Sequence, residues 1–238
     1  MNKLIFYFKK YNLLTILKFL YFEFRILIKG LLFNSFSQHG EDFFIYNYFK
    51  KRNYGFYIDI GAYHPKRFSN TFFFYKKSWK GLNIEANPDL IQEFNTSRSR
   101  DINLNIGVSN ANKKLIFYVF NPQTLSTFDL NAKEEYVSKG YELVKSIIVD
   151  VLPIREIINR YCKNTNIDFI SIDVEGHEIE VLEGFKNLTN FPKLICLESL
   201  DLKYEKKETF NEILENLKDM GYIKIKEIGV NAFFEKTN

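Results

Sequence analysis

The sequence predicts an α/β fold in which a mostly parallel sheet carries helices on both faces. Two observations lead to this prediction. Short apolar runs alternate with helical segments from residue 37 onward, and the chain closes with two strand-like segments, 222–228 and 231–235, separated by a tight turn at Gly229. Alternation of strands and helices favours a parallel sheet, whereas a two-residue turn joins antiparallel neighbours. We therefore expect an antiparallel edge strand at the C-terminal end of the chain.

Composition and charge narrow the classes of function. A chain of 238 residues suits one α/β domain with additions, and 46% hydrophobic with 26% charged residues is ordinary for a globular protein. The net charge of +4 is too small to indicate a nucleic-acid-binding protein. The two cysteines, Cys162 and Cys196, are far apart in the sequence and are predicted to be free thiols, which suits the cytoplasm.

The chain divides into an N-terminal segment, residues 1–36, and a main domain, residues 37–238. Residues 1–33 are strongly apolar, but their longest uncharged run, Tyr11–Leu17, is far shorter than the roughly 20 residues that span a bilayer. They also lack the uninterrupted apolar core of a secretory signal. Two interpretations fit this segment: a basic amphipathic helix in peripheral contact with the inner face of a membrane, or a helix packed over the edge of the domain.

The main domain opens with a predicted helix at 37–49 and a first strand at 56–60. The apolar residues of this strand surround Asp59 near its end, and Gly61 follows at once. Glycine permits a positive φ or a close approach of a ligand, and a carboxylate at a strand end accepts hydrogen bonds from ligand donors. A helix at 71–77 is expected next, with free backbone N–H groups facing the same loop.

The second strand, 81–85, ends at Glu85. An acid at this place in a βαβ unit commonly accepts hydrogen bonds from ribose hydroxyls. After a helix that begins near Pro88, a third strand is predicted at 102–108 and a further strand at 114–120, the latter as one arm of an inserted hairpin.

Residues 121–146 have the least regular pattern and are expected to form a functional or mobile loop. A short strand at 147–151, a helix at 152–161 and a fourth principal strand at 167–172, ending at Asp173, come next. The remaining predicted elements are a helix at 178–185, a strand at 193–197 ending at Glu198, a helix at 209–220 and the closing pair of strands.

Asp59, Glu85 and Asp173 each end a predicted parallel strand, so we expect them at one rim of the sheet, where ligands bind. Three carboxylates at one place repel each other unless a cation relieves the repulsion. The loop after the first strand also has only one glycine, Gly61, where a pyrophosphate-binding G-x-G-x-x-G motif needs three. This pattern favours a cationic nucleoside, such as a sulfonium, over a dinucleotide.

The sequence resembles the FkbM family of S-adenosylmethionine-dependent methyltransferases. The resemblance spans about residues 37–199, and its matching segments, in order, are SQHGEDFFI, YIDIGAYHP, RFSNTFFFYKKSWKGLNIEANP, NLNIGVSN, LSTF, IDFISIDVEGHEIEVLEGF and PKLICLES. It implies a class I methyltransferase (Rossmann-like) fold and methyl transfer to an oxygen, often a hydroxyl of a sugar or polyketide.

The resemblance also implies a set of cofactor-binding residues, namely Asp59, Gly61, Ser69, Asn70, Glu85, Asn105, Asp173, Gln38 and Glu41. The first four would hold the methionine portion of S-adenosylmethionine, and the last two would close the pocket. Glu85 would bind the ribose hydroxyls, Asn105 or its neighbours would lie near the adenine, and Asp173 would sit beside the sulfonium and face the acceptor.

The predicted catalytic residues are His177, Asp173 and Glu175. A hydroxyl acceptor must lose its proton, and His177 is the first candidate for the general base because a neutral imidazole is available near pH 7. The alternative is that His177 caps the following helix or orders its loop. The same three side chains suit a magnesium or manganese ion, but their spacing does not demonstrate one, and a metal is not favoured.

Other polar residues are weaker candidates. His64 and His39 are expected to have structural roles in their loops, and Ser126 and Thr127 fit either hydrogen bonding to an acceptor or a turn. The leading hypothesis is an O-methyltransferase acting on a hydroxyl of a sugar in a surface polysaccharide or glycoconjugate, with a small-molecule or glycan acceptor. The alternatives are a non-catalytic, membrane-associated scaffold of the same fold and a nicotinamide-dependent oxidoreductase, which the missing glycines disfavour.

Overall fold

The computed structural model describes residues 17, 21, 35–198 and 207–237 of the chain. Except at positions 17 and 21, the prediction for residues 1–33 concerns a segment that lies outside the described residues. In the part of the chain that the structure describes, no helix is both long enough and apolar enough to cross a membrane.

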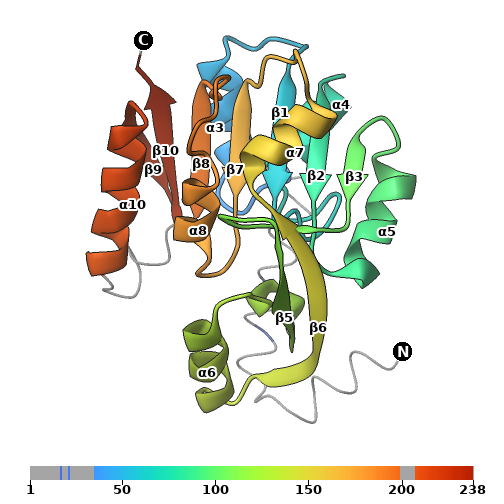
Figure 1. The fold of residues 1–238 in the computed structure, drawn as a ribbon. Coiled ribbons are helices and arrows are strands. Elements are labelled where there is room, and N and C mark those ends of the chain that lie inside the picture. Colours follow the sequence, from blue (N-terminus) through green and yellow to red (C-terminus); the bar gives the residue numbers. More distant parts are fainter. Residues whose placement is uncertain (1–16, 18–20, 22–34, 199–206, 238) are drawn as a thin grey trace.

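A seven-stranded sheet forms the centre of the molecule, with the strand order β3-β2-β1-β7-β8-β10-β9 (Figure 1). The first five strands pair in parallel, whereas β10 is antiparallel to both of its neighbours. The strands are β1 (Phe56–Ile60), β2 (Lys80–Ile84), β3 (Ile102–Leu104), β7 (Phe169–Ile172), β8 (Leu194–Glu198), β9 (Tyr222–Ile228) and β10 (Asn231–Lys236). The predicted mixed sheet is confirmed. Its antiparallel strand lies one place in from the edge, which β9 occupies.

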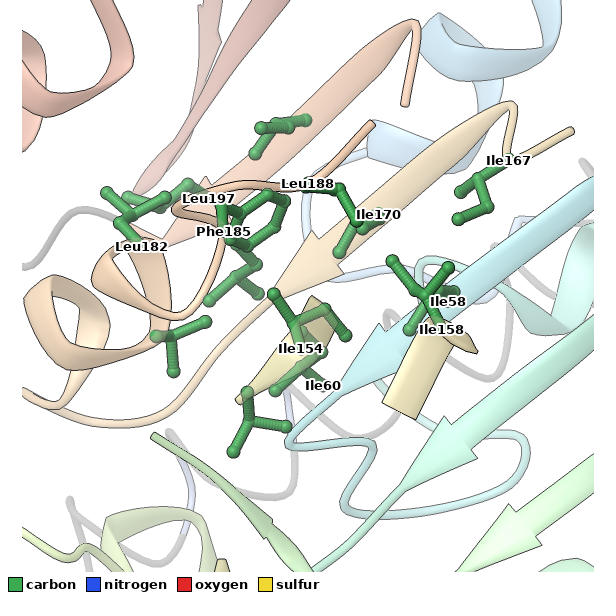
Figure 2. Packing of buried hydrophobic residues seen from close by; sticks show 14 of the residues in the cluster. Ile58, Ile60, Ile154, Ile158, Ile167, Ile170, Leu182, Phe185, Leu188 and Leu197 are labelled. Carbon is green, nitrogen blue, oxygen red and sulfur yellow. The ribbon is translucent and has the colours of Figure 1, made fainter. Parts of the chain in front are cut away.

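One face of this sheet is covered by an aliphatic core. Isoleucine and leucine residues from β1, β2, β7 and β8 pack there against three helices, which are α7 (Ile154–Tyr161), α8 (Glu178–Glu183) and α10 (Lys207–Asp219). Figure 2 shows Ile58 and Ile170 of the strands pointing toward Ile154 and Ile158 of α7. Burial of this apolar surface supplies the main favourable term that holds these helices on the sheet.

The opposite face carries an aromatic core. Tyr57 and Phe169, which alternate along their strands with the aliphatic residues, meet Trp79 and two further helices there, α3 (Glu41–Tyr48) and α4 (Phe72–Lys76). Successive side chains of a strand point to opposite faces, so neighbouring residues of β1 and β7 contribute to different cores. A further helix, α5 (Pro88–Ser97), begins at the N-cap Asn87, whose side chain accepts a hydrogen bond from the backbone of Asp89.

A second, three-stranded sheet projects from the main one, in the order β4-β6-β5 (Figure 1). We call its projecting part, residues 113–152, the arm. The arm consists of β5 (Lys113–Asn121), the short helix η2 (Gln123–Leu125), α6 (Leu130–Ser138) and β6 (Glu142–Leu152). Its two long strands pair antiparallel from Lys113 opposite Val151 to Asn121 opposite Glu142. The short strand β4 (Gly107–Val108) pairs in parallel with the last residues of β6.

Three sequence-based predictions need correction here. The predicted strand 102–108 is two strands, β3 and β4, which belong to different sheets. The strand predicted at 147–151 begins at 142, and the predicted loop 121–146 contains η2 and α6. The first half of β6 has no clear alternation of apolar residues, and its strand conformation depends on the partner strand β5, which a local pattern does not reveal.

Candidate functional site

A cavity opens at the carboxyl ends of β1, β2, β7 and β8, where the parallel strands of such sheets bind ligands. Its walls come from the loops that follow β1, β2 and β7, from the end of β8, from the segment before α3, from β4 and from the arm. Of the predicted site residues, it is lined by Gln38, Asp59, Gly61, Ser69, Asn70, Glu85, Asp173 and Glu175. The structure thus brings eight predicted residues from distant parts of the sequence to one place.

Asp59 is held at the floor of the cavity by a network centred on Arg98. The Arg98 side chain, 0% exposed, donates to the Pro65 carbonyl (2.7 Å), to Thr71 Oγ1 (2.6 Å) and to Ser69 Oγ (2.6 Å). Thr71 Oγ1 in turn donates to the Asp59 carboxylate. Burial raises the pKa of Asp59 to about 6, and the nearby positive charge of Arg98 opposes that rise.

Asn70 is fixed on the β7 side of the cavity, where its side-chain amide donates to Ser171 Oγ at 3.0 Å. Ser69 Oγ also accepts from the backbone N–H of Phe72, at the start of α4, at 3.0 Å. The predicted pair of Ser69 and Asn70 therefore orients the loop after β1 and borders the cavity at the same time.

Gly61 cannot carry a side chain in this fold. Its φ is +76°, and an added Cβ would lie 1.7 Å from the carbonyl oxygen of Asp173. The ends of β1 and β7 approach each other this closely because the backbone of Asp173 also donates to Ile60 O at 3.0 Å. Glycine is thus required both for its backbone conformation and for the contact between the two loops that carry the acids.

Glu85 is preorganised as an acceptor of hydrogen bonds. Its two carboxylate oxygens accept from the backbone N–H groups of Tyr63 (2.8 Å) and Asn87 (2.7 Å), which leaves lone pairs for a ligand. Burial raises the pKa of Glu85 to about 7, and these two backbone bonds oppose the rise. Asn105 does not line the cavity; its amide donates to the carbonyls of Glu85 (2.8 Å) and Ala86 (3.1 Å) and so braces the loop, while residues 106–108 form the wall.

The segment before α3 contributes one of its two predicted residues to the cavity. Gln38 lines it, whereas Glu41 is 0% exposed and lies behind the wall. Glu41 accepts from the His39 backbone N–H (2.7 Å) and from the Asn231 side chain (2.9 Å), so it ties the N-terminal loop to β10. Glu41 therefore does not line the cavity, and its role in closing the pocket stays a prediction.

A group of three carboxyl groups forms the other end of the cavity. The side-chain oxygens of Asp173, Glu175 and Glu198 lie within 4.8 Å of one another. Asp173 and Glu198 come together because β7 and β8 are parallel neighbours in which Ile172 pairs with Leu197. Glu175 has a φ of +51° and accepts from the Tyr136 hydroxyl at 2.9 Å, so the arm fixes its position.

Desolvation by the surrounding protein atoms is the largest cause that raises the pKa of each of these three carboxyl groups above its ordinary value, although Asp173 itself is exposed on the cavity wall. The charge of Asp173 raises the pKa of Glu175 and of Glu198 further. Clustered acids whose pKa values are raised by desolvation and mutual repulsion are typical of sites that bind a cation or accept a proton.

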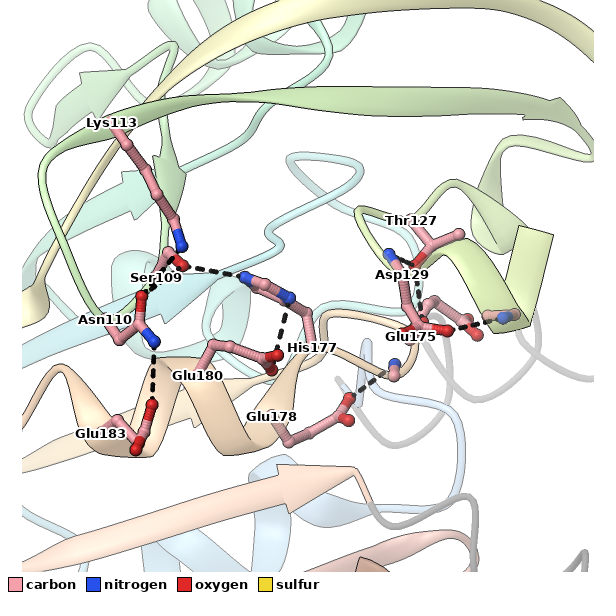
Figure 3. A network of polar contacts seen from close by, with 12 residues as sticks. Ser109, Asn110, Lys113, Thr127, Asp129, Glu175, His177, Glu178, Glu180 and Glu183 are labelled. Carbon is pink, nitrogen blue, oxygen red and sulfur yellow. Dashed lines mark hydrogen bonds and ion pairs between the residues drawn. The ribbon is translucent and has the colours of Figure 1, made fainter.

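His177 lies away from the cavity, contrary to its predicted role as general base. Its side chain is 8% exposed, with Nε2 3.1 Å from Ser109 Oγ and Nδ1 3.4 Å from a Glu180 oxygen (Figure 3). The left-handed conformations of Glu175 and Gly176 turn the chain, so that the Glu175 and His177 side chains point to different sides of the loop. His177 also makes no side-chain capping bond to α8, and its position fits a role in holding the loop against β4.

Of the remaining weaker candidates, one lines the cavity and the others have structural contacts only. Ser126 lines the cavity, whereas Thr127 is 0% exposed and donates to the Glu175 carbonyl at 2.8 Å. His64 Nδ1 accepts two backbone N–H bonds within its own loop, and His39 packs over Gly229. Both histidines thus occupy the structural positions that the sequence led us to expect.

Two residues of the site were missing from the sequence-based set. Arg98 follows α5 and is separated by 39 positions from Asp59, so no local pattern connects it with the acids. Glu198 did have a signal, because it ends a predicted parallel strand exactly as Asp59, Glu85 and Asp173 do. Treating every strand-ending acid as a member of one set would have found it.

Most of the chain matches the model of one protein family. Residues 59–224 match the Methyltransferase FkbM domain, which is well over half of the sequence. No curated protein is matched by the sequence.

Solved structures that are similar to this chain include the following three. A candidate caffeoyl-CoA O-methyltransferase from Staphylococcus aureus is 13% identical with a TM-score of 0.45, covering 98% of this chain and 97% of its own. A TehB-like SAM-dependent methyltransferase from Corynebacterium glutamicum is 11% identical with a TM-score of 0.44, covering 90% and 97%. The fibrillarin pre-rRNA processing protein of Methanococcus jannaschii is 16% identical with a TM-score of 0.41, covering 78% and 69%.

Proposed function

We propose that this chain, which belongs to the FkbM family of S-adenosylmethionine-dependent methyltransferases, methylates a hydroxyl oxygen of a sugar in a surface polysaccharide or glycoconjugate. The family makes the protein a methyltransferase with S-adenosylmethionine as co-substrate, and its sheet is that of the class I methyltransferase fold. The acceptor and the oxygen atom are our proposal.

The residues of the cavity fit the co-substrate. The Glu85 carboxylate, held by two backbone N–H bonds, presents free lone pairs to ribose hydroxyls. The close packing of Gly61 on Asp173 leaves room for backbone only, and Ser69 and Asn70 add polar groups beside it. When bound, S-adenosylmethionine supplies a methyl group on a positively charged sulfur, and the acceptor oxygen gains that methyl as the carbon–sulfur bond breaks with its electron pair left on sulfur.

One observation carries the proposal of an oxygen acceptor: Asp173 borders the cavity at the end opposite Glu85's loop, within reach of two further carboxyl groups. A hydroxyl must give up its proton during transfer, and a carboxylate whose pKa is raised by desolvation is a better proton acceptor than an ordinary one. We assign to Asp173 the role of accepting that proton, in place of His177.

The arm supports a neutral, hydroxyl-rich acceptor. Gln123, Thr124 and Ser126 contribute uncharged polar side chains to the cavity wall, and Phe117 and Phe128 contribute aromatic surface. Uncharged polar groups set among aromatic rings suit a sugar, which offers hydroxyls at its edges and apolar C–H faces. A phosphate or carboxylate acceptor would instead call for basic residues, and the described lining residues include none.

The test has two steps. Isothermal titration with S-adenosylhomocysteine should show binding to the intact protein and at least tenfold weaker binding to Glu85→Gln. Incubation with S-adenosylmethionine and a panel of sugars, nucleotide sugars and glycolipids should then release S-adenosylhomocysteine with a sugar acceptor, and the product's methyl should reside on oxygen by mass spectrometry and NMR. Methylation of amines or thiols alone would contradict the proposal.

A further inference from the structure

The carboxyl groups of Asp173, Glu175 and Glu198 leave more negative charge in one place than the neighbouring residues neutralise. Among the described residues, no lysine or arginine forms an ion pair with any of the three. Tyr136 donates one hydrogen bond to Glu175, and a tyrosine hydroxyl carries no compensating charge. Three oxygen-bearing side chains thus converge without a cation of the chain.

A second observation points to a missing ligand rather than to a tolerated cluster. Glu198 Oε2 is buried and has no hydrogen-bond partner in the described structure. A buried carboxylate oxygen without a partner is costly, because it loses its bonds to water and gains none in return. The Glu198 side chain shares a hydrogen bond with Asp173, so one of its oxygens is paired within the group while Oε2 is left without a partner.

The geometry matches a hard divalent cation. Oxygens on opposite sides of Mg²⁺, Mn²⁺ or Ca²⁺ are roughly 4–5 Å apart, given metal–oxygen distances of about 2.0–2.6 Å. The three side chains offer oxygens within 4.8 Å of one another, so small side-chain rotations suffice to reach one ion. Carboxylate ligands without imidazole or thiolate favour magnesium or manganese over zinc or copper.

We propose that Asp173, Glu175 and Glu198 bind one divalent cation, Mg²⁺ or Mn²⁺, at the acceptor end of the cavity. This replaces the set of Asp173, Glu175 and His177 considered from the sequence, since His177 points to the other side of the loop. The cation's role rests on the proposed function: its open positions receive the acceptor hydroxyl, orient it and lower its pKa, so that its proton passes to the Asp173 carboxylate oxygen that does not bind the cation. Cation binding itself does not depend on that role.

Titration with Mn²⁺ tests the site directly. Free Mn²⁺ is measured by electron paramagnetic resonance while the ion is added to the full chain, which should bind one Mn²⁺ that Mg²⁺ displaces. Glu198→Gln and Glu175→Gln should each weaken this binding at least tenfold. The matched control is Asp150→Asn, which removes the same charge from an exposed position of β6 and should leave Mn²⁺ binding unchanged.

Three results would overturn the proposal: no Mn²⁺ binding by the intact chain, equal binding by the intact chain and both glutamate variants, or an equal loss in Asp150→Asn. Circular dichroism and titration with S-adenosylhomocysteine show whether each variant is folded, and the second glutamate variant serves if the first does not fold. If Mn²⁺ binds as expected but S-adenosylhomocysteine does not, the methyltransferase proposal fails while the cation site stands.

Discussion

Both ends of the cavity contain acidic side chains, but the two sets differ in whether their oxygens already have hydrogen-bond partners. At the end formed by β1 and β2, Asp59 and Glu85 accept hydrogen bonds from Thr71, Tyr63 and Asn87, and Arg98 lies behind them. At the end formed by β7 and β8, one acid oxygen is buried without a partner among the described residues. The first end is complete before a ligand arrives, whereas the second requires something from solution.

From this difference we expect the first end to recognise the cofactor and the second end to take part in the methyl transfer. A group that orients a ligand works best when its own position is fixed by other bonds, because less freedom is lost on binding. A group that receives a proton or a cation needs lone pairs that other bonds do not occupy. Changes at the first end should therefore affect folding and cofactor affinity, and changes at the second should affect turnover.

The largest effect expected at the first end comes from Arg98→Met. This change removes four hydrogen bonds, to Pro65 O, Thr71 Oγ1, Asn83 Oδ1 and Ser69 Oγ, and leaves the buried Asp59 carboxyl without its nearby positive charge. Loss of one partner from a buried charged network costs about 3–5 kcal/mol. Urea denaturation should show this loss in the free energy of unfolding. Arg100→Met, an exposed neighbour, is the control and should change it by less than about 0.5 kcal/mol.

At the second end, Asp173→Asn should separate turnover from binding. Removal of a general base typically lowers the rate by about 10²–10⁴-fold, because the amide cannot accept the acceptor's proton. Release of S-adenosylhomocysteine in the presence of the acceptor measures kcat. The affinity for S-adenosylhomocysteine, measured by titration, should change less than tenfold. A parallel loss of kcat and of this affinity would show that the two ends of the cavity do not have separate roles.

Gly61→Ala tests the contact on which both ends depend. The added Cβ would meet the Asp173 carbonyl oxygen at 1.7 Å, in a backbone conformation that side chains rarely adopt. We expect a loss of roughly 2–4 kcal/mol in the free energy of unfolding, seen as a lower thermal midpoint. Gly140→Ala is the matched control, because that glycine also has a positive φ but no atom within 4 Å of the added Cβ. Equal effects would show that backbone strain, and not the contact, matters at Gly61.

The pH dependence of stability should also distinguish the first end. The folded-state pKa of Glu85, about 7, lies above its ordinary value, so the native protein holds a proton that the unfolded chain releases. Its contribution to stability is therefore full at low pH and is lost as pH rises through about 7. Thermal midpoints of the cofactor-free protein between pH 5 and 8 should fall more steeply than those of Glu85→Gln. Parallel curves for the two proteins would show that Glu85 does not titrate in this range.

The smallest effect concerns the link between the arm and the acids. Tyr136→Phe removes the hydroxyl that donates to Glu175 and leaves a part-buried carboxyl oxygen without this donor, which costs about 1–3 kcal/mol. We expect a lower kcat, of roughly tenfold, with an unchanged affinity for S-adenosylhomocysteine. Tyr141→Phe, a more exposed tyrosine of the same arm, should leave both quantities unchanged.

Local patterns sufficed for much of this molecule. Apolar runs that end in an acid identified β1, β2 and β7, and the turn at Gly229 identified the closing pair of strands. Patterns failed where a partner strand or a backbone turn determines the outcome. The first half of β6 is a strand because β5 lies beside it, and His177 leaves the cavity because Glu175 and Gly176 adopt left-handed conformations.

Periodicity and short motifs were enough to predict most strands and helices of the main sheet, the acids at the strand ends and the family. Which acids meet depends on the assembled sheet. Asp173 and Glu198 lie 25 positions apart, and they become neighbours through the parallel pairing of Ile172 with Leu197. Arg98 reaches the loop after β1 through a fold that no local spacing encodes. Side chains distant in sequence acquire shared charge, burial and hydrogen bonds only when the sheet assembles, and the chemistry of the site follows from those shared properties.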